Sequence, residues 1–503
     1  VRFLHGVASG DPSDNGAVLW TRVTPDGPLD TPVEVFVQVG TRASLRDLEQ
    51  ENLVRTSAAR DFTVKNFVSG LEPGREYFYR FRVGEALSPV GRFRTLPQQT
   101  ADVVLAVVSC SLHPGGLFNA YDAIARLPRL DAVIHLGDYI YEYGAADSDY
   151  GLTTGRQLSR IPQPPREIVT LEDYRLRHAQ YKADPDLQAA HARAAWITVW
   201  DDHETANDAW IGGAENHDPD QNEGDWAVRK AAALKAYYEW MPIREPAASA
   251  EMINRSFRFG DVASLHMVET RLTARTQQLD YARDLAMTAA GPDLAGFRSR
   301  LNDPARVLLG QAQMEDLARQ LDASVRAGVT WQLIGNQIVM ARVKGPDLVQ
   351  AAGREQVQAM IGAVEPGIRP RLQAMSQLFQ LGVPMNLDAW DGYPHERERL
   401  YGYIKGAKAR PIVLAGDSHA FWVNELKDAA GQRVAAEFGT TSVTSPGFGD
   451  VIKGVDLGAV IAQQNDEVVF SDQGAKGFTL LRLTRAEAVG ELNAVSTITA
   501  KPY

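Results

Sequence analysis

The sequence has 503 residues, of which 45% are hydrophobic and 23% charged, the balance of an ordinary globular protein rather than of a collagen, a coiled coil or a disordered chain. Acidic side chains outnumber basic ones by 63 to 52, so neither charge-driven nor sequence-specific nucleic-acid binding is expected. No apolar run approaches the ~18 residues that span a bilayer, and the single cysteine, Cys110, excludes an intramolecular disulfide.

The first hundred residues predict an all-β domain. Valines at alternate positions from 33 to 39 have the period-2 pattern of a strand with one buried face, and similar alternation returns over residues 77–83. Between them, Leu71-Glu72-Pro73-Gly74 predicts a turn, and the tyrosine that follows it suggests the tyrosine corner of β-sandwiches. We therefore expect a small immunoglobulin- or fibronectin-like sandwich over residues 1–98, followed by a short polar linker.

From residue 101 the pattern becomes an alternation of apolar strands with helices, which predicts an α/β domain over residues 101–503. The expected strands are 103–108, 132–134, 197–200, 331–334 and 411–415. Three helices are expected. The first carries Leu117, Tyr121 and Ile124 on one stripe, the second follows Asp225 as its cap, and the third carries Met314, Leu317 and Leu321 on one face. Segments 145–170 and 345–395 show neither pattern, so we expect loop-like insertions near a site.

Each of the five predicted strands ends in residues that can bind a metal or a polar ligand. The endings are Ser109-Cys110, Gly137-Asp138-Tyr139-Ile140-Tyr141, Asp201-Asp202-His203-Glu204, Gly335-Asn336-Gln337 and Gly416-Asp417-Ser418-His419. One such ending is ordinary turn chemistry, but five indicate a site, because open α/β sheets bind ligands at the carboxyl ends of their strands. Thiolate and imidazole favour transition metals, whereas carboxylate and amide oxygens favour Ca²⁺, Mg²⁺ or Mn²⁺. Two cations bridged by a carboxylate can hydrolyse phosphate esters.

In this order the motifs resemble those of the PhoD-type alkaline phosphatases and phosphodiesterases, in the calcineurin-like metallophosphatase superfamily. The resemblance covers nearly the whole chain, since it includes Gly6-Val7-Ala8-Ser9-Gly10-Asp11-Pro12, Leu19-Trp20-Thr21-Arg22, Trp390-Asp391-Gly392-Tyr393 and Thr444-Ser445-Pro446-Gly447. It implies a four-layer α/β/β/α metallophosphatase-like sandwich after the small all-β domain. It also implies hydrolysis of small phosphate monoesters and diesters by attack of a metal-bound hydroxide or oxide on phosphorus, without a covalent phosphoenzyme.

The resemblance further implies a role for each position. The metal ligands would be Cys110, Asp138, Tyr141, Asp202, Asn336, Asp417 and His419. Asp138 would bridge the cations, and His203 would be the catalytic helper that binds no metal. Oxygen donors replace several histidines of the superfamily, which fits a ferric ion together with calcium. Mn, Mg and Zn are the alternative cations.

The residues alone leave other interpretations open. Cys110 could be an inert buried thiol, Tyr141 a stacking aromatic and His203 a structural hydrogen-bond partner. Asp201 could be the ligand in place of Asp202, and His419 could support a ligand rather than be one.

Other functions also stay open: a phosphodiesterase or phospholipase D-like enzyme on the same centre, a non-catalytic carbohydrate- or surface-binding protein, and a ferric redox enzyme. We expect a monomer. We also expect a periplasmic or secreted location after twin-arginine export. The sequence opens on Val1 and shows no signal for that export.

Overall fold

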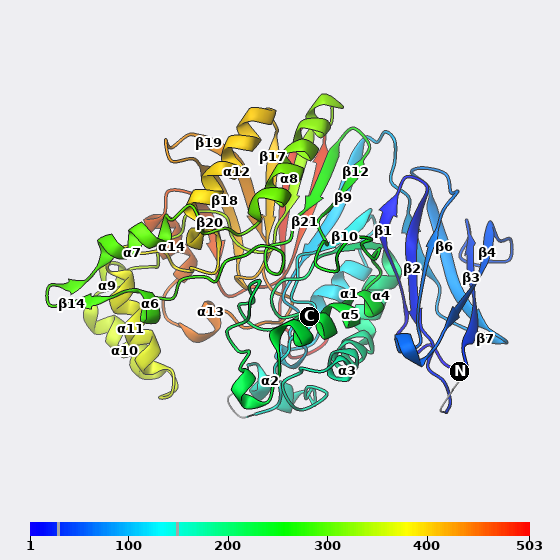
Figure 1. Cartoon of the computed structure of the whole chain (residues 1–503), viewed down its shortest axis with the longest axis horizontal. Coiled ribbons are helices and arrows are strands. Elements are labelled where there is room, and N and C mark those ends of the chain that lie inside the picture. The colour runs from blue at the N-terminus through cyan, green and yellow to red at the C-terminus, as the bar shows by residue number, and fades with distance from the viewer. Residues whose placement is uncertain (28–30, 147–149) are drawn as a thin grey trace.

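The computed structural model of the chain describes residues 1–27, 31–146 and 150–503. It is a mixed α/β fold in which two large sheets lie at the centre, helices cover them, and a smaller sheet lies at one end beside the N-terminus (Figure 1). The parallel strands of both large sheets direct their carboxyl ends toward one region, where the candidate site forms.

The larger sheet combines N-terminal, central and C-terminal segments. Its order is β22 (Ala488–Val495), β21 (Lys476–Thr484), β9 (Asp102–Val108), β10 (Ala132–His135), β11 (Ala195–Thr198), β1 (Val7–Ser13), β2 (Gly16–Arg22) and β5 (Thr63–Val68). The neighbours β9, β10, β11 and β1 are parallel, and the strands on either side of them are antiparallel. The continuous apolar run of residues 103–108 is buried throughout, as expected for a central strand covered on both faces.

The second large sheet is built from the later part of the chain. Its order is β12 (Arg255–Phe259), β13 (Ala263–Met267), β16 (Trp331–Gly335), β17 (Pro411–Ala415), β19 (Arg433–Gly439), β18 (Phe421–Lys427) and β20 (Val468–Asp472). Strands β13, β16, β17 and β19 run parallel. One hydrophobic cluster contains Val104, Leu105 and Leu480 of the larger sheet together with Leu333 and Leu414 of this one, so the two sheets pack face to face.

Residues 440–445 tie the ends of the two sheets together just after β19. The hydroxyl of Thr440 donates to the carbonyl of Val107, and the amide of Val443 donates to the carbonyl of Ser109. This junction fixes the end of β9 relative to the second sheet. The ends of strands from both sheets can therefore contribute to a single site.

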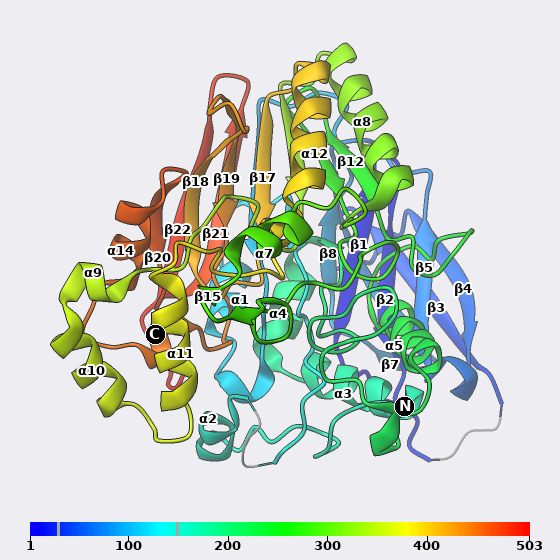
Figure 2. The ribbon, with the colours of Figure 1, turned by 60° about the vertical axis from the view of Figure 1, so that its left-hand side comes forward.

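Helices cover the outer faces of both sheets (Figure 2). On the larger sheet lie α1 (Asn119–Ala125) and α4 (Pro185–Arg193), with α3 (Leu171–Lys182) and α5 (Trp226–Trp240) beside them; on the second sheet lie α8 (Gly310–Arg326), α12 (Pro394–Ala407) and α14 (Leu457–Gln464). The remaining short helices are α2 (Leu152–Gln157), α6 (Tyr281–Asp284), α7 (Leu294–Leu301), α9 (Leu348–Ala352), α10 (Arg354–Ala363), α11 (Arg369–Phe379) and α13 (Phe448–Val451), and a hairpin joins β14 (Met287–Thr288) to β15 (Gly291–Pro292).

The N-terminal strands are divided between two sheets. The small sheet contains β4 (Gln50–Thr56), β3 (Val33–Gly40), β6 (Glu76–Val83), β7 (Ala86–Leu87) and β8 (Gly91–Arg94). It packs through Val35, Val37 and Phe81 against Leu19 and Val64, but the strands that carry Leu19 and Val64, β2 and β5, extend the larger sheet. The small sheet therefore faces strands that are hydrogen-bonded into the α/β core.

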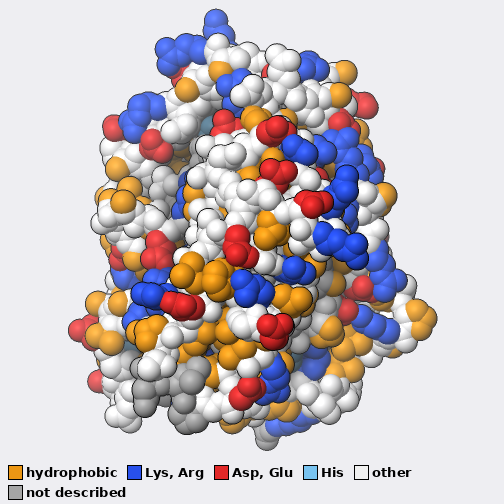
Figure 3. Space-filling model, turned by 90° about the vertical axis from the view of Figure 1, so that its right-hand side faces the viewer, with side chains coloured by type: hydrophobic (Ala, Val, Ile, Leu, Met, Phe, Trp, Pro, Cys, Tyr) orange, Lys and Arg blue, Asp and Glu red, His pale blue; other side chains and the backbone are white. Residues whose placement is uncertain are grey.

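The join between β1 and the core depends on close backbone contact. Strand β1 pairs in parallel with β11, with Gly10 opposite Trp196. A Cβ atom at Gly10 would lie 2.6 Å from the carbonyl oxygen of Trp196 and 2.1 Å from that of Pro242, so only glycine fits there. The surface formed by the N-terminal strands carries interspersed acidic and basic side chains (Figure 3).

Most of the expected elements are present, with differences in detail. The hydroxyl of Tyr77 accepts a hydrogen bond from the amide of Glu72, the contact that a tyrosine corner requires. Asp225 is the N-cap residue of α5, but its side chain makes no capping hydrogen bond within the described chain. The expectation of a loop over 345–395 is wrong, because α9, α10 and α11 lie there, and 145–170 contains α2; residues 147–149 of that segment lie outside the described residues.

Among the helices of the described chain, none combines the length and the apolar composition that crossing a bilayer requires.

Candidate metal centre

Four of the predicted site residues have a left-handed backbone conformation at the end of a strand. Cys110 follows β9 with φ 61°, Asp138 follows β10 with φ 56°, and Asp417 and His419 follow β17 with φ 61° and 56°. Left-handed φ is uncommon and costly for residues other than glycine, and such conformations cluster at functional sites. The same local geometry at three separate strand ends therefore supports a common site.

These strand ends bring metal-capable side chains together. Three groups have ligand atoms within 4.8 Å of one another: Cys110 with Asp138 and His419; Asp138 with Asp202 and His203; and Asp138 with Asp201, Asp202 and Asp417. We call these seven residues the donor cluster. Asp138 belongs to all three groups, the position that a bridging carboxylate would have.

Close backbone packing brings the ends of β10 and β11 together at Asp138. Gly137 has φ 105°, and a Cβ there would lie 2.4 Å from the amide nitrogen of Asp201, so the glycine of the Gly-Asp motif permits this approach. Glu204 then holds the turn, because its carboxylate accepts hydrogen bonds from the amides of Asp138 at 3.1 Å and Tyr139 at 2.6 Å.

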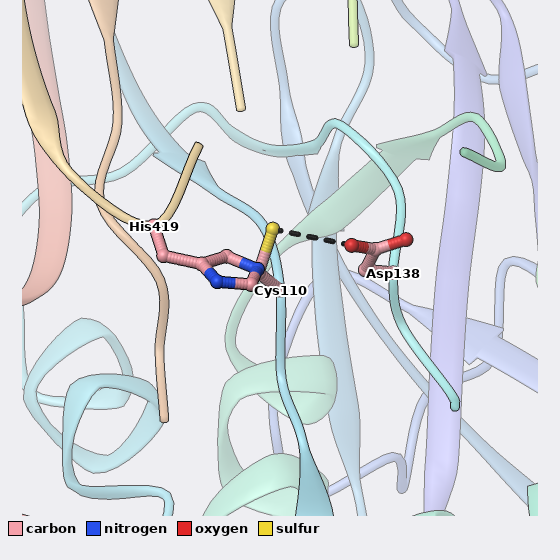
Figure 4. A group of neighbouring side chains, drawn as sticks. All are labelled: Cys110, Asp138 and His419. Atoms are coloured by element: carbon pink, nitrogen blue, oxygen red, sulfur yellow. Dashed lines mark hydrogen bonds between the residues drawn. The ribbon is translucent and has the colours of Figure 1, made fainter. Parts of the chain in front are cut away.

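One side of the donor cluster carries the Cys110 thiol and the His419 imidazole, which Figure 4 shows together with Asp138, and the Tyr141 phenol lies beside them. Cys110 Sγ donates to Asp138 Oδ2 at 3.4 Å, and the Tyr141 hydroxyl donates to the same oxygen at 3.1 Å and lies 3.4 Å from His419 Nε2. Burial, with the Asp138 carboxylate second, raises the pKa of the Cys110 thiol and of the Tyr141 phenol well above their usual values. Both would need a cation to be deprotonated, and thiolate and phenolate are ligands of transition metals.

The other side of the donor cluster consists of carboxylates. Burial, and then the charges of Asp201 and other neighbouring carboxylates, raise the pKa of Asp417 well above its usual value. Among the described residues, Asp201 Oδ2 and Asp202 Oδ1 are buried and take part in no hydrogen bond. Buried carboxylate oxygens normally have partners, so these two oxygens point to a ligand that completes their surroundings.

His203 lies between the two sides. Its Nδ1 is 2.7 Å from Oε2 of Glu142, a fully buried carboxylate, and its ring stacks on Tyr141 with centroids 4.2 Å apart. Burial lowers the pKa of His203, but Asp202 and Glu142 outweigh it and raise that pKa well above its usual value. The imidazole is therefore fixed through one nitrogen, which leaves Nε2 as the atom that can act on a ligand.

Asn336 is buried at the end of β16, but its amide faces other partners. Its Oδ1 accepts from Trp390 Nε1 at 3.0 Å, and its Nδ2 donates to the carbonyl of Ile338. Both partners lie outside the donor cluster. A role for Asn336 as a metal ligand stays a prediction.

A buried arginine at the centre of the site was missed by the sequence reasoning. Arg271 Nε donates to Asp201 Oδ1 at 2.6 Å, and its two terminal nitrogens bond both oxygens of Asp388 at 2.7 and 2.8 Å. The guanidinium also lies 3.8 Å from Asp202 and 3.7 Å from Asp417. It follows β13, a strand whose mixed sequence Ala-Ser-Leu-His-Met has no apolar run to identify it.

The residues of this site fit bound cations. Five aspartates (Asp138, Asp201, Asp202, Asp388 and Asp417) converge there, and within the described part of the chain Arg271 and Arg275 are the arginines that pair with them. Several buried carboxylates cannot all ionise without compensating charge. Cations would supply that charge and would also satisfy the two unpartnered aspartate oxygens.

We expect the stability of the metal-free protein, relative to the metal-loaded protein, to fall as the pH rises from about 4 to about 8. Burial and neighbouring carboxylates raise the pKa of Asp201 to about 6 and that of Asp208 to about 8. Between the unfolded and folded pKa values the folded state binds more protons, so each group loses ~1.4 kcal/mol of stabilisation per pH unit. Melting temperatures of chelated and metal-loaded protein from pH 5 to 8 should diverge with rising pH; parallel curves would contradict this expectation.

Comparisons with known proteins point to the same family over nearly the whole chain. The family described as "PhoD-like phosphatase, N-terminal domain" matches residues 1–97, and the family described as "PhoD-like phosphatase" matches residues 105–492. "Alkaline phosphatase D" of Bacillus subtilis (strain 168) is 34% identical over 465 residues, which cover 89% of this chain and 70% of that protein. The solved structure described as "Structure of PhoD" superposes with a TM-score of 0.81 at 30% identity, covering 99% of this chain and 88% of that one.

Proposed function

The chain belongs to the PhoD-like phosphatase family and is thus a phosphoric ester hydrolase, and from this premise we propose that its reaction takes place at the donor cluster. The observation that carries the proposal is the shared position of Asp138. It belongs to all three groups, so a carboxylate oxygen of Asp138 lies within 4.8 Å of a ligand atom of each other residue in the cluster. A carboxylate common to several potential metal positions is what a multinuclear hydrolytic centre requires.

The two sides of the donor cluster, with Tyr141 beside one of them, support two kinds of cation. Cys110, Tyr141 and His419 would hold a ferric ion, whereas Asp202 and Asp417 would hold calcium, with Asp138 shared between them. When bound, these cations polarise the phosphoryl group and lower the pKa of water. Arg271 holds Asp201 so that its carboxylate supports the ligands, and Glu204 holds the Asp138 turn.

His203 would be the catalytic residue beside the cations. Glu142 fixes Nδ1 and keeps the imidazole protonated, so Nε2 can donate a proton or a hydrogen bond to an oxygen of the substrate. The stacked ring of Tyr141 restricts rotation of the imidazole. Phosphate monoesters and diesters would both place an anionic oxygen within reach of such a donor.

We expect His203→Gln to lower kcat by roughly 10²–10³-fold while metal content stays unchanged, because the imidazole transfers or donates a proton rather than binding metal. Steady-state kinetics and elemental analysis of the same preparation measure the two quantities. Glu142→Gln is the matched variant: it keeps the hydrogen-bonding shape but lowers the pKa of His203, so activity should fall at a lower pH than in the parent protein. Loss of metal from His203→Gln would instead make this residue a ligand.

The proposal also covers the domain architecture of the enzyme, its oligomeric state and its cellular location. We propose a four-layer α/β/β/α catalytic domain built mainly from residues 101–503, preceded by a β-sandwich over residues 1–98 whose strands β1, β2 and β5 also extend the larger sheet. Packing of the two large sheets against each other, with α1 and α4 on one and α8 and α12 on the other, supports the layered arrangement. We also propose that the protein acts as a monomer in the periplasm or outside the cell, reached by twin-arginine export.

The test of the function is a metal inventory joined to a substrate comparison. Protein purified without chelators should contain iron and calcium in simple molar ratios to the chain, and zinc alone would refute the assignment of the metals. Hydrolysis of 4-nitrophenyl phosphate and bis(4-nitrophenyl) phosphate, which share a leaving group, separates monoester from diester preference. Absence of turnover with both substrates by metal-replete protein would overturn the proposed function.

A further inference from the structure

The segment of residues 442–447, which follows β19, is anchored beside the end of β9 and contributes no member of the donor cluster. The hydroxyl of Thr444 donates to the carbonyl of Leu112 at 2.6 Å, and the hydroxyl of Ser442 donates to the carbonyl of Ser445 at 2.6 Å. The side chains of all three segment residues are fully buried. The backbone of Ser445 therefore has a fixed position next to the metal centre, although the proposed function gives this segment no role.

The same segment orients His419. The Nδ1 atom of His419 lies 2.7 Å from the carbonyl oxygen of Pro446. A carbonyl group accepts hydrogen bonds but cannot donate them, so Nδ1 carries a proton and donates it to Pro446. Nε2 is then the nitrogen that faces the donor cluster, 3.4 Å from the hydroxyl of Tyr141. The segment thus determines which nitrogen of His419 can bind a cation.

Tyr141 is held at its backbone, its ring and its hydroxyl group. The guanidinium of Arg177 donates to the Tyr141 carbonyl, and the tyrosine ring stacks on His203 with centroids 4.2 Å apart. The hydroxyl oxygen of Tyr141 accepts from Ser445 Oγ at 2.7 Å while the group donates to Asp138 Oδ2 at 3.1 Å. Because Ser445 is fully buried, bulk water does not compete for its contact with Tyr141.

The hydrogen bond from Ser445 becomes more important when Tyr141 binds a cation. A phenolate has no proton, so its oxygen can no longer donate to Asp138 and can only accept. The Ser445 hydroxyl has two acceptors within reach, the Tyr141 oxygen at 2.7 Å and the carbonyl of Cys110 at 2.9 Å. A charged acceptor forms the stronger hydrogen bond, so the Ser445 hydroxyl should point at the phenolate.

We propose that Ser445 is a positioning residue of the metal centre: its hydroxyl donates to the Tyr141 phenolate, directs that oxygen toward the ferric ion and limits the electron density that the ligand passes to the metal. The inference rests on the proposed function, which places Tyr141 on that ion. Hydrogen bonds from neighbouring groups fix the orientation of metal ligands and tune the metal that they bind.

The readout is the visible absorption band that a phenolate bound to a ferric ion produces by charge transfer from ligand to metal. Metal-loaded, full-length protein is compared as the parent and as Ser445→Ala. Without the hydrogen bond the phenolate is the stronger electron donor, so the band should move to longer wavelength. The kcat for 4-nitrophenyl phosphate should fall by about 10–100-fold. Tyr141→Phe should lack the band, which assigns the band to this residue.

Two further variants separate this effect from a general loss of packing. Thr444→Val removes another fully buried hydroxyl of the same segment, one that bonds the carbonyl of Leu112 rather than Tyr141. Its band should coincide with that of the parent, even where its melting temperature is lower. Ser445→Gly also lacks the hydroxyl and should show the same shift as Ser445→Ala, which keeps the test decisive should the alanine variant fail to fold.

Each result decides the inference. An unchanged band in Ser445→Ala or Ser445→Gly overturns it, as does an equal shift in Thr444→Val. A parent protein that hydrolyses 4-nitrophenyl phosphate but shows no such band also overturns it, and hydrolysis at the donor cluster then still stands. If the band shifts as expected in protein that turns over no phosphate ester, the role of Ser445 is supported and the proposed function fails.

Discussion

Asp138→Asn should abolish phosphate-ester hydrolysis and metal binding together. Asp138 is the one residue common to all three groups of candidate ligands, so loss of its negative charge weakens every metal position at once. The decrease in kcat/KM should exceed the ~100-fold upper limit for residues that only support metal ligands. Asparagine tolerates the left-handed backbone of this position, φ 56°, so the chain should still fold. Elemental analysis and kinetics on the same protein measure both losses.

The same variant should lose activity but gain thermal stability in its metal-free form. Burial and neighbouring carboxylates raise the pKa of Asp138, so the ionised group is unfavourable in metal-free protein. Metal-free Asp138→Asn should therefore melt at a higher temperature than the metal-free parent. Asp11→Asn is the matched control: Asp11 is also buried, with φ 42°, but pairs with Arg255 outside the cluster, so its loss should lower stability and leave metal content intact. Retained turnover in Asp138→Asn would contradict the bridging role.

The ends of the apolar strands could be predicted from the sequence because their signal is local. A continuous apolar run followed by Gly-Asp or Ser-Cys marks both a buried strand and its carboxyl end, and parallel strands place those ends at one edge. Cys110, Asp138 and Asp417 accordingly lie in connected groups although about 300 residues separate the first from the last. Asn336 satisfied the same local pattern, but its amide bonds Trp390 and Ile338. A strand ending predicts where the backbone of a residue lies, but it does not determine the direction of the side chain.

Contacts between distant segments could not be predicted in this way. Arg271 and Asp388 are 117 positions apart and bond through both oxygens of the carboxylate, yet neither follows a strand that an apolar run identifies. Glu142, one residue after Tyr141, was likewise missed, because only the folded loop shows that it bonds His203. The arginine and carboxylates that balance charge at a site depend on the finished packing rather than on local pattern.

One larger difference has the same origin. Strands β1, β2 and β5 belong to the segment expected to form a small sandwich, but pairing of β1 with β11 adds them to the larger sheet. That pairing is a long-range property, which period-2 alternation does not encode. The helices of the 345–395 segment are a different case, because their signal is local: Val357, Met360 and Ile361 in α10, and Leu372, Met375 and Phe379 in α11, recur at helical spacing, which the expectation of a loop overlooked.

Arg271→Met should destabilise the protein and weaken its metal binding, and the two effects can be separated. The guanidinium is fully buried and pairs with Asp201 and Asp388, so its removal leaves carboxylates unpaired in the interior. Breaking a buried ion pair from one side costs ~3–5 kcal/mol. Loss of the support for Asp201 should also weaken metal binding by ~10–100-fold, as for other changes next to ligands. Denaturant unfolding and metal titration measure these two quantities.

Arg397→Met is the matched control for this prediction, because Arg397 is also buried and pairs with Asp391 at 2.8 Å, outside the donor cluster. It should lose a similar amount of stability but keep its metal affinity and its KM. Arg271→Lys preserves the charge but cannot bond both oxygens of Asp388 while also reaching Asp201, so it should fold and still bind metal more weakly than the parent. Equal metal affinity in Arg271→Met and Arg397→Met would show that Arg271 stabilises the fold alone and does not position the ligands.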